Sequence, residues 1–287
     1  MYRPTTAALA AALAIATLSP AQAAIIYSTI GSTYSQNFNS LPTTPQNTSL
    51  GNTPAGWTND NATPAAGNFS ILGWHLFHPT ALGAGEGGAN GNQRFRIGTG
   101  SNNSGAFWSF GESGMADRAL GGINSGTLSS TNANMFLGAK FTNNTGAIMT
   151  SFTLSYDGEQ WRDGGAATPN VQRLDFDYSL NATTIQDATF TNEDALDFVS
   201  PVFANTGGGN AVAGNSTGML PIGPVTVTGI NWAPGTDLWI RWRDVNNSGN
   251  DHGLSIDNLQ FSAIPEPGSV VLFVAAVLAL VGYRRFR

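Results

Sequence analysis

Residues 173–180 read Arg-Leu-Asp-Phe-Asp-Tyr-Ser-Leu, and their polarity alternates. Successive side chains of an extended strand point to opposite faces. The apolar side chains therefore share one face and the polar ones the other: Leu174, Phe176, Tyr178 and Leu180 against Arg173, Asp175 and Asp177. This alternation is typical of an antiparallel strand that turns one face to a core.

The same period of two recurs along the chain. The further apolar faces are Met135, Leu137, Ala139 and Phe141; Phe152, Leu154 and Tyr156; and Leu238, Ile240 and Trp242. Clusters of Gly, Asn and Pro separate these segments, and such clusters favour turns. The sequence therefore predicts an all-β fold, either a sandwich or a barrel.

The last predicted strand changes its pattern partway along. The residues expected to face the core are Leu254 and Ile256 before the change and Leu259 and Phe261 after it. The two pairs differ in parity, so one extra residue must be inserted between them. We expect a β-bulge near Asp257-Asn258.

Composition limits the chemistry that this chain can perform. It has no cysteine, which excludes disulfides, zinc–thiolate sites and thiol nucleophiles. Its net charge is −6, and an acidic protein is a poor partner for nucleic acid, so we expect none. The Gly- and Asn-rich residues 206–218 predict a mobile loop.

Residues 1–23 predict a secretory signal peptide. Arg3 supplies the positive charge, residues 7–18 are apolar, and Ala21-Gln22-Ala23 is a small-x-small cleavage site. We expect passage through the Sec translocon and cleavage by signal peptidase between Ala23 and Ala24. The body would then be residues 24–263, which is long enough for one large core.

The C-terminal end has three parts in a fixed order. Pro265-Glu266-Pro267 precedes an apolar run without charge, and Arg284-Arg285-Phe286-Arg287 follows it. The run predicts one transmembrane helix whose basic end, with Arg284, Arg285 and Arg287, stays in the cytoplasm. Proline is excluded from a helix interior, so the Pro-Glu-Pro segment is expected to be extended and accessible outside the membrane.

In these three parts, residues 264–287 resemble the PEP-CTERM sorting signal of Gram-negative bacteria. The resemblance implies that exosortase, a membrane transpeptidase, cuts at Pro265-Glu266-Pro267. The protein would be held transiently in the inner membrane and then reach the cell surface or the extracellular space. Extracellular polysaccharide is a further candidate partner. An ordinary single-pass anchor is the alternative.

The body carries a series of short motifs along its length. They are residues 36–41, Trp57, and residues 117–121, 156–162, 241–244 and 250–258. In these motifs the body resembles a jelly-roll-like module of bacterial secreted proteins. The resemblance implies an antiparallel, jelly-roll-like β-sandwich. It implies no particular activity, because jelly rolls host many functions.

Four oxygen-bearing residues near the C-terminal end of the body form a candidate structural Ca²⁺ site. Asp244, Asn246 and Asp251 share one loop, and Asp257 lies in the strand that follows. Carboxylate and amide oxygens are the ligands that calcium prefers. The alternative is a plain turn whose side chains cap their own backbone. His252, a poor ligand for calcium, is expected to form a hydrogen bond.

The polar face of residues 238–243 is a candidate carbohydrate-binding surface. It carries Trp239, Arg241 and Arg243. An aromatic ring can stack on a sugar ring while arginines bind its hydroxyl or acidic groups. The alternative is that a loop covers the tryptophan and that the arginines pair with nearby aspartates.

Glu159 and Asp163 are candidates for the acid–base pair of a glycosidase. The alternative is a β-turn in which they pair with Arg162 or Arg173. The sequence contains no convincing catalytic constellation. We therefore expect an exported cell-surface or exopolysaccharide-matrix protein with a structural or adhesive role, with a carbohydrate-binding module and a secreted hydrolase as the alternatives.

Overall fold

The computed structural model describes residues 24–44, 49–52, 71–79, 94–126, 134–166 and 170–266. Several predictions fall outside this part of the chain: the signal peptide with Ala23, residue Trp57, and the tail with Pro267, Arg284, Arg285 and Arg287. Among the described residues, no helix is long and apolar enough to cross a membrane. Their helical content is a single 3₁₀ turn, η1 (Asp194–Leu196).

The described strands form two sheets. The first contains β1 (Ile25–Tyr27), β4 (Trp74–Phe77), β8 (Asn134–Asn143), β10 (Arg173–Ser179), β11 (Thr191–Asn192), β12 (Phe198–Val199) and β15 (Asp237–Val245). Its order is β1-β8-β15-β10-β11, with β4 also on β8 and β12 also on β10. The pairing of β1 with β8 is parallel and the others are antiparallel.

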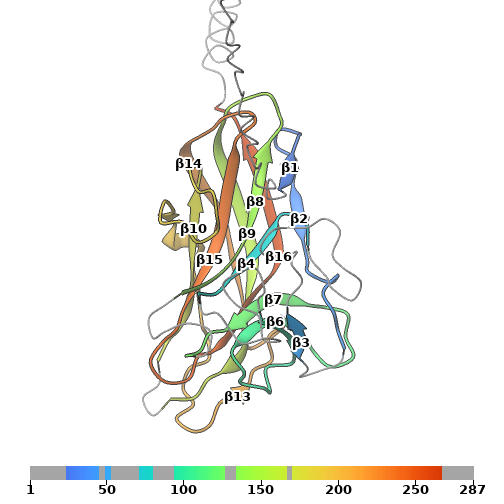
Figure 1. Ribbon diagram of the computed structural model, residues 1–287, viewed down its shortest axis with the longest axis vertical. Helices are drawn as coiled ribbons and strands as arrows, with labels where there is room; N and C mark the ends of the chain where they lie inside the picture. The colour runs from blue at the N-terminus through green and yellow to red at the C-terminus, as the bar shows by residue number, and fades with distance from the viewer. Residues whose placement is uncertain are drawn as a thin grey trace, which may run out of the picture.

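The second sheet contains β2 (Tyr34–Gln36), β3 (Ser49–Asn52), β5 (Arg94–Gly98), β6 (Ala106–Phe110), β7 (Ala119–Ile123), β9 (Met149–Asp163), β13 (Asn210–Ala211), β14 (Met219–Trp232) and β16 (Gly253–Ile264). Its order is β13-β9-β16-β7-β6-β5-β3, with β14 also on β9 and β2 also on β16. The long strands follow the long axis of the molecule, with β1 near its upper end and β13 at its lower end (Figure 1).

The two sheets pack face to face through their alternating apolar side chains. Phe141 of β8 stacks on Phe261 of β16, with 4.3 Å between ring centroids. Trp242 of β15 meets Tyr156 of β9 edge-on at 5.2 Å. The inward faces predicted for residues 135–141, 152–156 and 238–242 are all buried in this core. The period of two thus correctly predicted an all-β sandwich.

The predicted β-bulge is confirmed in β16. Its register with β9 shifts between Asp257 and Gln260. Asn258 takes a left-handed φ of 49°, a conformation that asparagine tolerates better than most residues. As expected, the apolar residues on both sides of the bulge are buried. The bulge therefore keeps one core face while it redirects the side chain of Asn258.

The segment predicted as a mobile loop, residues 206–218, is held against β9. The Val212 N–H donates to the Trp161 carbonyl oxygen at 2.8 Å. Gly214 lies so close to the indole of Trp161 that an added Cβ would stand 2.1 Å from its Cε2 atom. The glycines led us to predict a mobile loop, but in the structure Gly214 allows the backbone to lie close to the Trp161 ring.

Candidate functional site at one end of the sandwich

A polar pocket of about 220 Å³ opens at the end of the sandwich where β16 begins. Glycines line it together with Asn103, Asn124, Arg162, Asn250 and Asp251. These side chains come from three regions that the fold brings together: the turns around β6 and β7, the end of β9, and the loop between β15 and β16. The loop that predicted a calcium site therefore borders a pocket.

A buried hydrogen-bond network stands behind this pocket. The Nε2 atom of His252 lies 3.4 Å from the Asp163 Oδ1 atom. The Gln160 Nε2 atom donates to His252 Nδ1 at 3.2 Å and to the Val202 carbonyl oxygen at 2.5 Å. Burial lowers the pKa of His252, and the Asp163 charge only partly opposes this. His252 thus forms a hydrogen bond, as predicted.

This His–Asp pair does not form a nucleophilic triad. In such a triad a hydroxyl occupies the imidazole nitrogen opposite the aspartate. Here the amide of Gln160 occupies that nitrogen, and it is a donor without nucleophilic character. The network is therefore suited to holding the end of β9 against the start of β16.

Arg162 is the cationic group of the pocket. Its Nη1 atom donates to the carbonyl oxygens of Gly100 at 3.0 Å and Ser101 at 3.3 Å. Burial lowers the pKa of Arg162, and the neighbouring Asp163 raises it. Because arginine stays charged in proteins, the pocket keeps one fixed positive charge beside Asp251.

The structure divides the four predicted calcium ligands. Asp244 and Asp251 are close enough for their charges to interact, and Asn246 is buried in the same loop. Asp257 belongs to a different cluster, because it lies on the face of β16 near Glu159 and opposite Asp157. The first residues of β16, 253–256, separate Asp257 from the loop.

The remaining pair fits a cation only in part. The Asp244 Oδ2 atom is buried without a hydrogen-bond partner, and burial followed by the Asp251 charge raises the pKa of Asp244 well above its usual value. Burial also raises the pKa of Asp251 to about 7. Calcium takes six to eight oxygens, and no group of three His, Cys, Asp or Glu residues in the described ranges could hold a metal ion. Calcium binding therefore remains a prediction.

The candidate sugar-stacking surface is covered. Trp239 is 1% exposed and packs with Phe136, Ala182 and Ile185. Arg241 pairs with Asp177 at 3.0 Å. Arg243 pairs with Asp175 at 2.8 Å. The residues after β10 fold over this face, so the prediction of a displayed Trp239 is wrong and the alternative, with a covered ring and paired arginines, describes the structure.

The candidate glycosidase carboxylates are both buried, and they bind different partners. Glu159 is 2% exposed and accepts a hydrogen bond from Trp161 Nε1 at 2.9 Å. Burial raises the pKa of Glu159 to about 7, against that hydrogen bond. Asp163 accepts hydrogen bonds from the backbone of Gly165 and Asn205. Both residues lie in β9 and not in a β-turn, and their hydrogen-bond partners differ from the Arg162 and Arg173 that the alternative proposed, although the Asp163 charge acts on Arg162.

The sequence did not predict that Asn124 and Arg162 would line the polar pocket or that Gln160 would belong to the network behind it. Gln160 and Arg162 belong to a motif that the sequence singled out, but nothing showed that β9 would bring them to the loop before β16. Asn124 is 1% exposed and donates from Nδ2 to the Asp244 carbonyl oxygen at 2.9 Å. The sequence feature that could have pointed to these residues was weak, because it consisted of polar residues next to glycine-rich turns.

Comparison with known proteins gives no family. No family model and no curated protein matches the chain. The K3 cleaved adhesin domain of Lys-gingipain from Porphyromonas gingivalis is similar at 12% identity over 66% of this chain and 91% of its own, with a TM-score of 0.33. TmCBM61, solved with beta-1,4-galactotriose, is similar at 7% identity over 53% and 74%, with a TM-score of 0.26.

A Bacillus thuringiensis Cry1Da tryptic core variant is similar at 11% identity over 57% of this chain, with a TM-score of 0.31. This chain spans only 22% of the length of that protein. At such low scores these likenesses decide nothing about function.

Proposed function

We propose that this protein is an exported bacterial surface or exopolysaccharide-matrix protein with a structural or adhesive role, sorted through its PEP-CTERM-like tail. The position of the sandwich within the chain carries the proposal. β1 begins at Ile25, one residue after the expected signal-peptidase site. β16 ends at Ile264, directly before Pro265. Both proposed cuts therefore flank the fold.

The first and last strands are fastened to each other independently of either signal. The Tyr27 hydroxyl donates to the Ser32 carbonyl oxygen at 2.8 Å and accepts from the Ala263 N–H at 2.9 Å. The Gly31 N–H donates to the Ala263 carbonyl oxygen at 3.0 Å. Removal of residues 1–23 and of the tail would leave these contacts intact. This favours a body that folds outside the membrane, as a jelly-roll-like module.

A non-catalytic role fits the acidic residues better than hydrolysis does. Glu159 and Asp163 are buried and committed to hydrogen bonds with the protein itself. His252 is flanked by an amide and a carboxylate, without a hydroxyl at either ring nitrogen. These groups hold strands together, whereas an acid–base pair must reach its substrate.

The test is the intact mass and the location of the protein in its native host. The wild type is compared with a variant in which Pro265-Glu266-Pro267 is changed to Ala-Ala-Ala. We expect a wild-type mass that ends near Pro265 and is found outside the inner membrane, and an uncut variant that stays in the membrane. An uncut C-terminus in both proteins would mean a permanent anchor and would refute sorting by exosortase.

A second candidate function is carbohydrate binding. It is favoured by a hollow of about 200 Å³ at the bulge of β16, which is lined mostly by carboxamide side chains. Structural and carbohydrate-binding roles are compatible, because a matrix protein can hold polysaccharide without changing it.

A further inference from the structure

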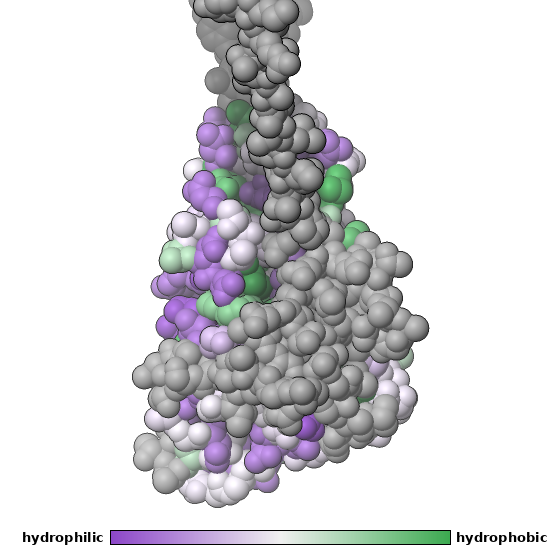
Figure 2. Space-filling model, viewed as in Figure 1, coloured by the Kyte–Doolittle hydropathy of each residue, from purple (hydrophilic) through white to green (hydrophobic). Residues whose placement is uncertain are grey.

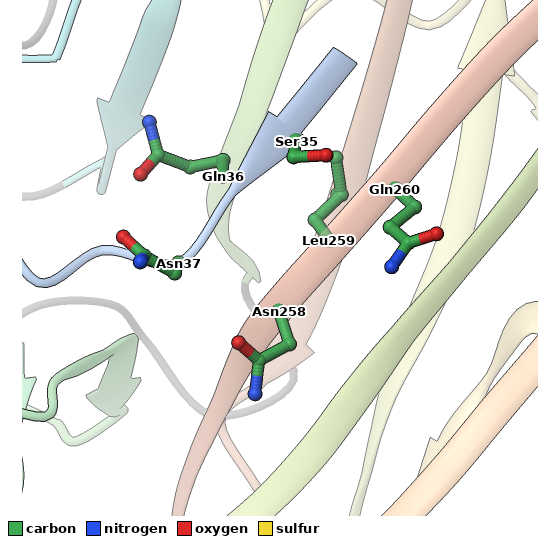
Figure 3. A pocket seen from close by; sticks show the side chains of 6 residues that line it. All are labelled: Ser35, Gln36, Asn37, Asn258, Leu259 and Gln260. Atoms are coloured by element: carbon green, nitrogen blue, oxygen red, sulfur yellow. The ribbon is translucent and has the colours of Figure 1, made fainter. Parts of the chain in front are cut away.

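A second hollow, of about 200 Å³, lies where β2 pairs with β16. Its lining residues are Ser35, Gln36, Asn37, Asn258, Leu259 and Gln260 (Figure 3). Most of them carry carboxamide groups, and none carries a charge. Figure 3 shows Gln36 and Asn37 coming from β2 and the turn after it, and Asn258 coming from β16 on the same side of that strand. We call this hollow the amide groove.

The bulge places Asn258 in the amide groove. Its left-handed φ of 49° turns the side chain away from the alternation of β16. The Nδ2 atom of Asn258 donates to the Asp157 Oδ2 atom at 3.0 Å. Because a carboxylate accepts but does not donate, this contact fixes the orientation of the amide. The carbonyl oxygen of Asn258 is left as an exposed acceptor.

Gln36 and Asn37 offer the complementary donors. The Gln36 Oε1 atom accepts from the Phe38 N–H at 2.8 Å. The Asn37 Oδ1 atom accepts from the Asn39 N–H at 3.2 Å. Each oxygen is thus held by local backbone. The Gln36 NH₂ group donates one hydrogen to the Tyr34 hydroxyl oxygen at 3.5 Å, so its second N–H and the NH₂ group of Asn37 are the donors left for a ligand. Phe38, which follows them, has a left-handed φ of 52° and is fully buried, so it anchors the turn after β2.

The groove therefore presents oriented donors and an oriented acceptor on a frame of two paired strands. Such pre-organisation lowers the entropic cost of binding. A ligand that matches it must donate and accept at neighbouring atoms, as the adjacent hydroxyl groups of a sugar ring do. With the Asp157 carboxylate bound to Asn258, and no arginine or lysine in the lining, an anionic ligand is disfavoured.

We propose that the amide groove binds a neutral sugar unit of an extracellular polysaccharide. This proposal rests on the proposed export of the protein, because only an exported protein meets such a ligand. The groove is small and shallow compared with drug-sized pockets of about 300–1,000 Å³, so one site binds weakly. Repeated units along a polysaccharide compensate through multivalency when many copies of the protein share a surface.

The experiment is biolayer interferometry of the full-length protein in a zwitterionic detergent without a sugar headgroup. Sensors carry dextran, galactomannan, xylan or alginate. We expect binding to at least one of the three neutral polysaccharides, and none to the anionic alginate. Asn258→Gly should weaken binding about tenfold, since one lost hydrogen bond to a ligand has about that effect. Glycine accepts the left-handed φ, so the bulge survives.

The matched control is Asn144→Ala, which removes an exposed carboxamide in the turn after β8, away from the groove. It should bind as the wild type does. If Asn258→Gly unfolds, Gln260→Ala takes its place, because that exposed side chain also lines the groove. Binding to none of the neutral polysaccharides, binding to alginate alone, or equal binding by all variants would overturn the proposal.

The outcomes separate this proposal from the proposed export. Binding to a neutral polysaccharide by a protein that is never cut at Pro265-Glu266-Pro267 would leave the groove assignment standing and refute sorting. Correct processing without binding would do the reverse.

Discussion

Replacing Asp257 by asparagine should stabilise the protein at alkaline pH and change little at pH 4. The Asp257 Oδ1 atom is buried without a hydrogen-bond partner. Burial raises the pKa of Asp257 to about 8, against a backbone hydrogen bond from Asn258 and with a further rise from the Glu159 charge. The folded protein therefore favours the neutral form, which asparagine imitates.

The sign and size follow from linkage. Because the folded pKa lies above the unfolded value of 3.8, the full stability is present below about pH 4 and is lost as the pH rises towards 8. Each pKa unit corresponds to about 1.4 kcal/mol, so a rise of the pKa from 3.8 to about 8 corresponds to about 5–6 kcal/mol at pH 8.5. The variant should recover a large part of that free energy of unfolding.

The assay is urea unfolding at pH 4 and pH 8.5 at constant ionic strength, read as the change in midpoint. Asp187→Asn is the control of opposite sign. Burial opposes ionisation of Asp187, yet hydrogen bonds from Thr184 and Thr183 outweigh it and lower the pKa of Asp187. This control should lose stability at pH 8.5. If Asp257→Asn destabilised the protein at pH 8.5, or shifted both midpoints equally, the reasoning would be refuted.

Three further predictions concern other parts of the molecule. Arg241→Met should lower the free energy of unfolding by about 3–5 kcal/mol in thermal or urea unfolding, because it removes the nearer guanidinium from the buried Asp177 carboxylate and leaves only Arg243 at 3.9 Å; a loss below 1 kcal/mol would contradict this. Calcium at pH 8 should raise the unfolding midpoint of the wild type and not that of Asp244→Asn; equal responses would exclude this residue as a ligand. Gly158→Ala should cost about 1–3 kcal/mol, since its Cβ would stand 2.2 Å from the Phe198 ring, and an unchanged melting temperature would show that the ring yields.

The sequence predicted the core of the fold well. Strict alternation, as in residues 135–141, fixes which face is buried, and a break in parity at Asp257-Asn258 revealed the bulge. These are local signals, and burial of one face makes the register costly to change. The same reasoning could not foresee β14, whose exposed and proline-containing sequence alternates poorly.

The candidate site was harder to predict because it depends on long-range packing. Asp175 and Asp177 were correctly placed on the outer face of β10, but both are buried: arginines flank Asp175, and the segment with Ile185 and Asp187 covers the Asp177–Arg241 pair. The same cover hides Trp239. Likewise Asp244 and Asp257 are close in sequence, yet the strand between them carries Asp257 to another cluster. The period of the side chains and the composition describe single segments of the chain. The burial of Trp239 and the separation of Asp244 from Asp257 depend instead on how distant segments pack on one another.

In the coloured part of Figure 2, apolar residues are scattered among polar ones. The most extensive strand pairing among the described residues lies in the second sheet. β16 pairs with β9 along nearly its whole length and with β7 and β2 on its other side. A chain held at its C-terminal end and pulled at the opposite end of the sandwich is loaded along β16. That load shears many ladder hydrogen bonds together, whereas a sideways load would open them one after another. The fold would thus resist drag when it is tethered by the segment that follows Ile264.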